Sequence, residues 1–121
     1  MTSTKRRNTG PSLAVRDLVR SRDMDACVRC GAWDRPEIWP RHQIHHRVPR
    51  GLGGSRRPEI NSPANLVLVC AVCHARIESH RDEAREDGWL VRQGHDPALT
   101  PIPGPEGWVL LTHDGQIQEC P

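Results

Sequence analysis

Apolar positions recur at two different spacings along the chain, and the spacing indicates which element each segment forms. Residues 13–22 follow Ser12 and place aliphatic side chains near helical spacing, which predicts a short helix with a serine cap. Short apolar runs at 43–48 and 65–70 predict two strands. Residues 74–86 contain no Gly or Pro and are rich in Ala, Arg and Glu, which predicts a second helix.

The C-terminal third has a different pattern. Residues 89–91 predict a short strand, and residues 97–105 predict a proline-rich connection. Residues 108–118 predict a β-hairpin that turns at Asp114-Gly115. Together these elements predict an α+β fold with an N-terminal helix and a C-terminal β-hairpin appendix.

We expect the chain to divide into three parts. Residues 1–12 are polar and basic without apolar periodicity, so they predict a flexible basic arm. Residues 13–86 form the main domain, which contains a long loop at 49–58 rich in glycine, proline and arginine. Residues 87–121 form a β-rich extension that packs on or beside that domain.

Composition limits the size of the core. The chain has 121 residues, 36% of them hydrophobic, and its aromatic residues are four Trp with no Phe or Tyr. Apolar burial alone would stabilise such a fold poorly, so we expect an additional covalent or metal link. No apolar run approaches the ~20 residues of a membrane span, and the N-terminus lacks the apolar segment of a secretory signal. We therefore expect a cytoplasmic protein that does not contact membranes.

Four of the five cysteines form two Cys-x-x-Cys pairs, Cys27/Cys30 and Cys70/Cys73. Each pair places two thiols on one tight turn, and two such turns complete a tetrahedral site, so the spacing predicts a structural zinc ion. A disulfide pair or a redox site is the alternative, which the missing secretory signal disfavours. Cys120 is left over and is expected to be unimportant.

Charge is distributed unevenly between the two halves of the chain. Residues 1–60 contain 13 Lys and Arg against 6 Asp and Glu, whereas residues 61–121 contain 4 against 9. This asymmetry predicts a basic face directed at a polyanion and an acidic remainder that does not touch it. Residues 41–57 contain no acidic residue and are expected to lie along a phosphate backbone through five arginines: Arg41, Arg47, Arg50, Arg56 and Arg57.

Histidines lie between and beside the two cysteine pairs. His45 and His46 are adjacent on a predicted strand, so they point to opposite faces and one of them can face a metal ion. His74 directly follows Cys73, so a zinc site that fixes the cysteine also fixes the histidine. The alternatives are that His45 and His46 bind zinc or form a surface pair, that His74 completes the zinc site, and that Asn65 is only a turn cap.

A series of motifs follows one another along the sequence. These are Cys27/Cys30, His45-His46, Gly53-Gly54, Asn65-Leu66, Cys70/Cys73 and His74. In this series the chain resembles the HNH endonucleases of the ββα-metal group. The resemblance extends from Cys27 to about Arg85. It implies a small zinc-stapled ββα-metal fold and a metal-dependent endonuclease that hydrolyses phosphodiester bonds of DNA. Residues 86–121 resemble, more weakly, the tail of small HNH proteins of actinobacteria and their phages.

The resemblance implies a role for each matching residue. His46 takes the position of the general base, and a neutral imidazole can accept a proton from water at neutral pH. His45 takes the position of a metal ligand, where many relatives have Asp, and His74 that of the second ligand. Asn65 takes the position of the residue that bonds within the loop between the two strands.

Three further residues complete the predicted site. Glu78, one helical turn after His74, is a candidate third ligand whose carboxylate suits Mg²⁺ or Mn²⁺, with Ni²⁺ as another candidate. Arg47 and Arg76 are candidates to shield the phosphate oxygens, because they lie next to His46 and close to His74 in the sequence. The products implied by the family mechanism have 5′-phosphate and 3′-hydroxyl ends.

Two other functions fit part of the pattern. A zinc-ribbon DNA-binding adaptor without catalysis would need the cysteines but would not need the histidines and Asn65 in register. An RNA-directed nuclease would need the same residues as the DNA endonuclease. We expect a monomer with weak sequence preference, since no base-reading cluster is evident. The likeness to phage HNH proteins suggests the large terminase subunit of genome packaging as a partner, while restriction, mobile-element and toxin roles stay open.

Overall fold

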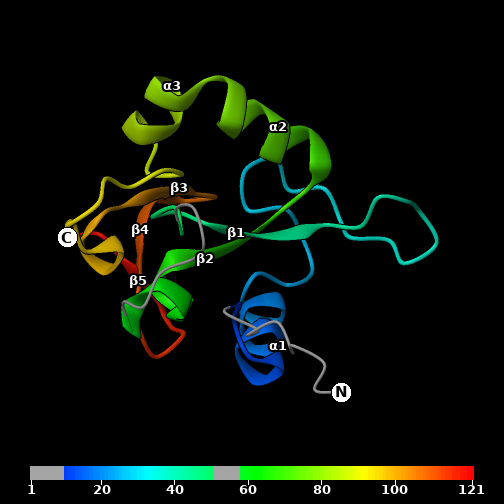
Figure 1. Cartoon of the computed structure of the whole chain (residues 1–121), viewed down its shortest axis with the longest axis horizontal. Coiled ribbons are helices and arrows are strands. Elements are labelled where there is room, and N and C mark those ends of the chain that lie inside the picture. The colour runs from blue at the N-terminus through cyan, green and yellow to red at the C-terminus, as the bar shows by residue number, and fades with distance from the viewer. Residues whose placement is uncertain (1–9, 51–57) are drawn as a thin grey trace, which may run out of the picture.

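The computed structural model describes residues 10–50 and 58–121, which form a two-stranded ribbon flanked by helices and followed by a three-stranded sheet (Figure 1). The elements are α1 (Leu13–Arg22), β1 (Gln43–His46), β2 (Leu66–Val69), α2 (Ala71–Ser79), α3 (Arg81–Glu86), β3 (Ile102–Gly104), β4 (Gly107–Leu111) and β5 (Ile117–Glu119). The predicted α+β class is confirmed. No helix among the described residues is long and apolar enough to cross a membrane.

The first helix, α1, begins where the sequence predicts. The Ser12 hydroxyl accepts a hydrogen bond from the backbone N–H of Val15 at 3.2 Å, which satisfies one of the free donors at the helix start. At the other end, the Arg22 guanidinium donates to the carbonyl of Leu66 at 2.6 Å, and Asp23 accepts from the N–H of Leu68 at 3.0 Å. These contacts fix the helix end against β2.

The strands β1 and β2 pair in antiparallel register, with His45 opposite Val67 and His46 opposite Leu66. Every residue of β2 is buried, so this strand lies at the centre of the fold. Opposite residues of an antiparallel pair share a face, which places His45 on the Val67 face and His46 on the other. The predicted division of the two histidines between faces is therefore what the register shows.

The predicted helix 74–86 ends correctly at Glu86, but its start and its continuity are wrong. The α2 helix begins three residues earlier, because the Cys70 sulfur caps it by accepting from the N–H of Cys73 at 3.4 Å. The backbone leaves helical geometry at His80 and resumes as α3. The break directs α3 so that Ala84 joins the core cluster with Ile77 and Trp89.

The C-terminal sheet has one more strand than the sequence predicted. The hairpin of β4 and β5 is confirmed, and its turn places Gly115 at a φ of +91°. However, β3 lies inside the predicted proline-rich connection and pairs with β4, whereas residues 89–91 are not a strand. His113, in the hairpin turn, contacts the hydroxyl of Ser62 and the carboxylate of Asp96, so the turn is attached to the rest of the fold.

Candidate active site and zinc centre

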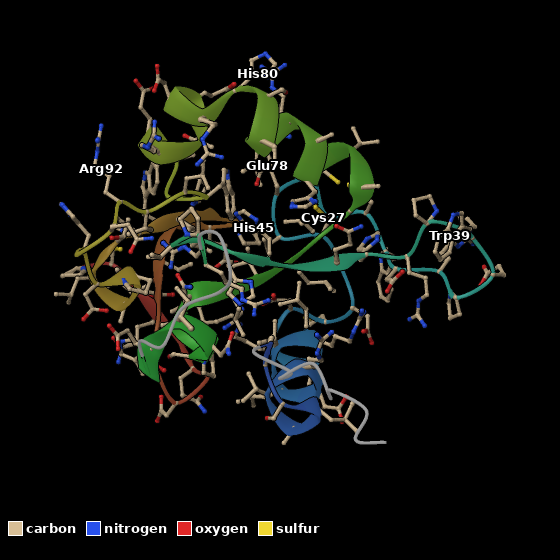
Figure 2. The ribbon with its side chains drawn as sticks, viewed as in Figure 1. Cys27, Trp39, His45, Glu78, His80 and Arg92 are labelled. Carbon is tan, nitrogen blue, oxygen red and sulfur yellow. The ribbon has the colours of Figure 1, made fainter. Side chains whose placement is uncertain are left out.

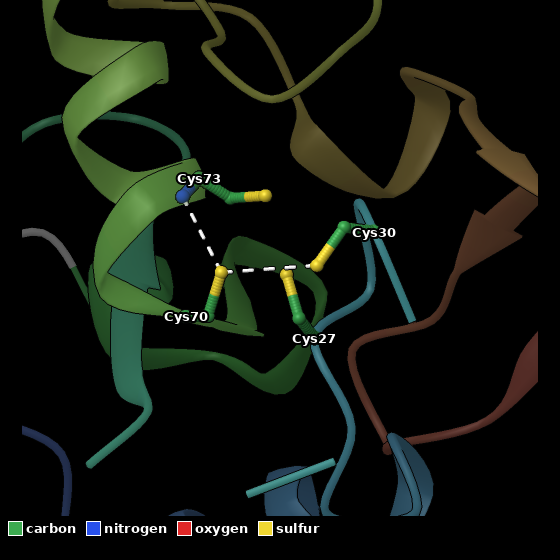
Figure 3. Close-up of side chains that lie close together, drawn as sticks. All are labelled: Cys27, Cys30, Cys70 and Cys73. Carbon is green, nitrogen blue, oxygen red and sulfur yellow. Dashed lines mark hydrogen bonds between the residues drawn. The ribbon is translucent and has the colours of Figure 1, made fainter. Parts of the chain in front are cut away.

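Four cysteines converge between the turn that follows α1 and the start of α2 (Figure 3). The sulfur atoms of Cys27, Cys30, Cys70 and Cys73 all lie within 4.8 Å of one another, and all four are free thiols. The Cys30 and Cys70 sulfurs are 3.8 Å apart. Four thiolates at ~2.3 Å from a tetrahedral zinc ion lie about 3.8 Å from each other, so the cluster has the dimensions of a zinc site.

The electrostatics of the four thiols also suit a cation. Burial raises the pKa of the Cys73 thiol to about 12, even though the Arg29 guanidinium donates to its sulfur at 3.4 Å. Burial also acts to raise the pKa of Cys27, but backbone hydrogen bonds from Cys70, Cys30 and Arg29 bring it below its usual value. Without a cation such a cluster cannot hold four negative charges, so the donor set fits a dication.

A second set of metal-binding side chains lies between β1 and α2. The ligand atoms of His45, His74 and Glu78 are all within 4.8 Å of one another, and the two imidazole centroids are 5.4 Å apart. Glu78 Oε1 lies 3.9 Å from His74 Nε2, one helical turn away on the same face of α2. Figure 2 shows His45 beneath α2, with Glu78 above it. The structure thus brings together the three residues predicted to hold the catalytic cation.

The orientation of His45 fits a metal ligand. Its Nε2 donates to the carbonyl of Trp89 at 2.8 Å, which leaves Nδ1 as the nitrogen with a free lone pair. Metal-binding histidines are commonly held by such a bond from the second nitrogen. Burial lowers the pKa of His45 to about 4, so the ring is neutral at physiological pH, as a ligand must be.

His46 is held by a residue that the sequence reasoning missed. Its Nε2 donates to the side-chain oxygen of Asn61 at 2.8 Å, so Nδ1 carries the free lone pair. Burial lowers the pKa of His46, and the nearby cations Arg50 and Arg16 lower it further, against the raising effect of the Asn61 bond. The imidazole is therefore neutral at pH 7 and able to accept a proton.

Asn65 is fully buried and joins the two ends of the loop between β1 and β2. Its side-chain oxygen accepts from the N–H of Val48 at 2.7 Å, while its amide donates to the carbonyls of Val48 and Ile60. This is the bonding within the loop that the family resemblance implies. It fixes the backbone directly after His46 and Arg47.

Arg47 corrects the expectation that it contacts a phosphate. The residue is 0% exposed, and its guanidinium donates to four backbone carbonyls. These belong to Ala64, Gly88, Pro97 and Thr100, at 2.6 to 2.9 Å. Alternation along β1 continues past the strand end and turns this side chain inward, so Arg47 joins residues 88–100 to the end of β1 and to the segment before β2.

The other predicted phosphate contacts fall into three groups. Arg41 pairs with Asp34 at 3.2 Å, and Arg76 pairs with Glu83 at 3.0 Å. Arg76 is two residues after His74 on α2, so the two side chains are on different faces of that helix. Arg50 lies close enough to His46 to lower its pKa, and its buried Nε has no hydrogen-bond partner among the described residues. Arg56 and Arg57 lie outside the described residues.

Comparison with known proteins agrees with this geometry. A family described as HNH endonuclease matches residues 27–80. A probable HNH endonuclease of Lactococcus phage SK1 is 40% identical over 70 residues, which cover 55% of this chain and 68% of that protein. The chain belongs to the HNH endonuclease family. No solved structure shows significant similarity.

The HNH match runs from the first zinc-site cysteine to the end of α2 and contains every residue of both clusters. The chain is accordingly a nuclease of the HNH type, as the sequence motifs indicated. Four carbonyl contacts of the HNH site come from outside the matched range, namely that of Trp89 on His45 and those of Gly88, Pro97 and Thr100 on Arg47. A carbonyl exists in every residue, so no side-chain pattern could have shown them.

Proposed function

We propose that this HNH nuclease hydrolyses phosphodiester bonds of double-stranded DNA, with His46 as general base and one divalent cation on His45, His74 and Glu78. The observation that carries the proposal is the convergence of those three ligands next to a neutral, oriented imidazole. His45 and His46 leave β1 on opposite faces, but they are adjacent at the end of the strand, and we propose that one phosphate lies across this strand end and meets both residues.

In the proposed reaction, His46 Nδ1 accepts a proton from the attacking water, because Nε2 is committed to Asn61. A divalent cation bound by His45, His74 and Glu78 supplies Lewis-acid stabilisation of the phosphate and of the departing 3′ oxygen. Two imidazoles and one carboxylate suit Mg²⁺, Mn²⁺ or Ni²⁺. The products would carry 5′-phosphate and 3′-hydroxyl ends.

Arg50 takes the phosphate-binding role that the sequence assigned to Arg47. Its buried Nε lacks a partner among the described residues and lies near His46, so an anionic oxygen there would satisfy it. Arg16, an exposed residue of α1, is the second cation beside His46. We propose that these two arginines bind the phosphate that His46 attacks.

Nicking of supercoiled plasmid in Mg²⁺, Mn²⁺ or Ni²⁺ tests the proposal. General-base catalysis contributes about 10²- to 10⁴-fold, so His46→Ala should lower the nicking rate by at least 100-fold. His80→Ala, which removes an exposed imidazole at the end of α2, should leave the rate within twofold. Nicking retained by His46→Ala would remove this residue as base, and no cleavage with any of the three cations would favour the zinc-ribbon adaptor.

The biological setting is proposed from the source of the similar protein, which is a phage. We propose a role in phage DNA packaging together with a large terminase subunit. Co-purification of the chain with the terminase encoded by the same genome tests that partner. Cleavage of RNA in the same buffers tests the RNA-directed alternative.

A further inference from the structure

An open groove of about 420 Å³ lies between α3 and the coil that follows it. Its lining includes Arg81 and Arg85 of α3, Arg92 and His95 of the coil, and Pro49. Among the residues that the structure describes, no carboxylate lines this groove. We call it the α3 groove.

The α3 groove gathers most of the positive charge of an otherwise acidic half. Residues 61–121 contain four basic residues, and three of them line the groove. The Arg92 side chain is exposed and forms no hydrogen bond or ion pair with any residue that the structure describes, while its backbone carbonyl accepts from the N–H of His95 at 3.1 Å. Figure 2 shows Arg92 extending from the coil after α3, at the opposite end of the molecule from Trp39.

The two paired arginines keep donors for an anion. Arg85 uses Nη1 for Asp82, whose side chain is fully exposed, and Arg81 uses Nη1 for Glu78. Surface ion pairs of this kind contribute little stability, and each guanidinium has five N–H donors. Both side chains can therefore bind a phosphate without a large loss elsewhere.

Residues that line the groove contact residues of the proposed active site and the backbone beside it. Glu78, which Arg81 contacts at 2.8 Å, is also a proposed ligand of the catalytic cation. Val91, in the floor, donates its N–H to the carbonyl of Arg47, directly after His46. Two residues earlier, the Trp89 carbonyl holds His45. A nucleic-acid strand cleaved at His46 would therefore have the positive charges of the α3 groove close to its neighbouring phosphates.

We propose that the α3 groove binds the phosphates of the cleaved nucleic acid that neighbour the scissile one. This inference rests on the proposed function and reverses the expectation that residues 61–121 avoid the polyanion. The recognised chemistry is the phosphodiester backbone, since arginine forks match phosphate oxygens and the amide of Gln93, which also lines the groove, already donates to the carbonyl of Pro49 at 2.9 Å.

Charge reversal at Arg92 tests the proposal, with Arg35→Glu as the matched control. Arg35 is 65% exposed, lies in the loop that carries Trp39, and undergoes the same charge change. Binding of the zinc-loaded full chain to a 20-base-pair duplex is measured over a salt series in a His46→Ala background. We expect Arg92→Glu to weaken binding at least tenfold and to reduce the log–log salt slope by about 1, with Arg92→Lys near normal and Arg35→Glu within twofold.

A second measurement separates this proposal from the proposed function. Bis(p-nitrophenyl) phosphate contains one phosphodiester and no neighbouring phosphate, so the cleavage rate of this compound by Arg92→Glu with intact His46 should match the wild-type rate. Two results would overturn the groove assignment. One is that Arg92→Glu binds the duplex as tightly as Arg35→Glu does, and the other is that Arg92→Glu loses activity equally toward DNA and toward bis(p-nitrophenyl) phosphate. A wild-type chain that neither binds nor cleaves the duplex would overturn the proposed function, and the groove assignment with it.

Discussion

Arg47 holds together two parts of the chain that the sequence separates. Burial lowers the pKa of Arg47 to about 10, so the guanidinium is still charged at neutral pH although it is 0% exposed. Four carbonyls, rather than a carboxylate, compensate this charge. Because Arg47 adjoins His46, its bonds also fix the backbone that carries the proposed base.

Replacing Arg47 by Met keeps most of the side-chain volume and removes every one of these bonds. Buried carbonyls without partners cost about 1–3 kcal/mol each, partly recovered by relaxation, so we expect unfolding free energy to fall by about 3–5 kcal/mol. Urea denaturation of the zinc-loaded protein measures this. The exposed Arg35→Met should change stability by less than about 0.5 kcal/mol, and an equal loss in both variants would contradict the assigned role.

Asn61 is a positioning residue for His46. Replacing it by Ala removes the acceptor of the Nε2 proton, so the imidazole loses its fixed orientation. We expect kcat for plasmid nicking to fall roughly 10- to 100-fold with KM within about twofold. Asn61→Asp keeps an acceptor oxygen and should recover most of the rate, and an Asp variant as slow as the Ala variant would contradict the positioning role.

At the scale of elements, the carboxylate of Asp34 attaches the loop before β1 to the first helix, α1. Asp34, with a side chain 2% exposed, accepts from Arg20 at 2.9 Å, Arg41 at 3.2 Å and the N–H of His42 at 3.2 Å. Burial acts to raise the pKa of Asp34, but these three donors outweigh it and hold the pKa below its usual value. Ionised Asp34 therefore stabilises the folded loop.

The consequence is a defined pH dependence. A carboxyl with a lowered folded pKa stabilises the protein above its unfolded pKa of about 4, and this contribution is lost as pH falls through the folded value. We expect the stability difference between wild type and Asp34→Asn to be constant from pH 7 to 5 and to shrink below about pH 4. Thermal denaturation of both proteins checks this, since acid effects on the zinc site cancel in the difference. A constant difference down to pH 3 would contradict it.

The elements show where sequence patterns were sufficient and where they were not. The Ser12 cap and the Asp114-Gly115 turn depend on neighbouring residues, and both were predicted correctly. The start of α2 was missed because its cap is Cys70, a zinc-site thiol rather than a usual capping side chain. The break at His80 was missed because it depends on packing of Ala84 against the core, which no local pattern records.

The same distinction applies to the site. The motif spacing predicted that His45, His74 and Glu78 meet, because helix periodicity and the zinc turns determine where those side chains lie. It assigned Arg47 to the phosphate on its adjacency to His46, but adjacent residues of an extended chain point to opposite faces, and Arg47 points inward. Asn61 was missed because its partner is 15 residues away, across the loop.

At the scale of the whole molecule, the four-cysteine cluster joins the turn after α1 to the start of α2. Structural zinc in small domains contributes about 10–16 kcal/mol of apparent binding free energy, comparable to or larger than the stability of such a fold. We expect chelation to abolish cooperative thermal unfolding and added Zn²⁺ to restore it, as followed by circular dichroism. Cys73→Ser should fail to recover, whereas Cys120→Ser, outside the cluster, should behave as wild type. An unchanged melting temperature after chelation would show that the cluster is not structural.

The carbonyl bond between Trp89 and His45 gives the molecule a built-in optical reporter. The chain contains no tyrosine, and three of its tryptophans are 48–88% exposed, whereas Trp89 is 3% exposed. Acrylamide should therefore quench the emission of Trp33, Trp39 and Trp108 first and leave a blue-shifted remainder from Trp89 alone. Because the backbone of that residue touches a proposed ligand, titrating Mn²⁺ or Ni²⁺ into the quenched protein should change this residual fluorescence, and His45→Ala should remove the change.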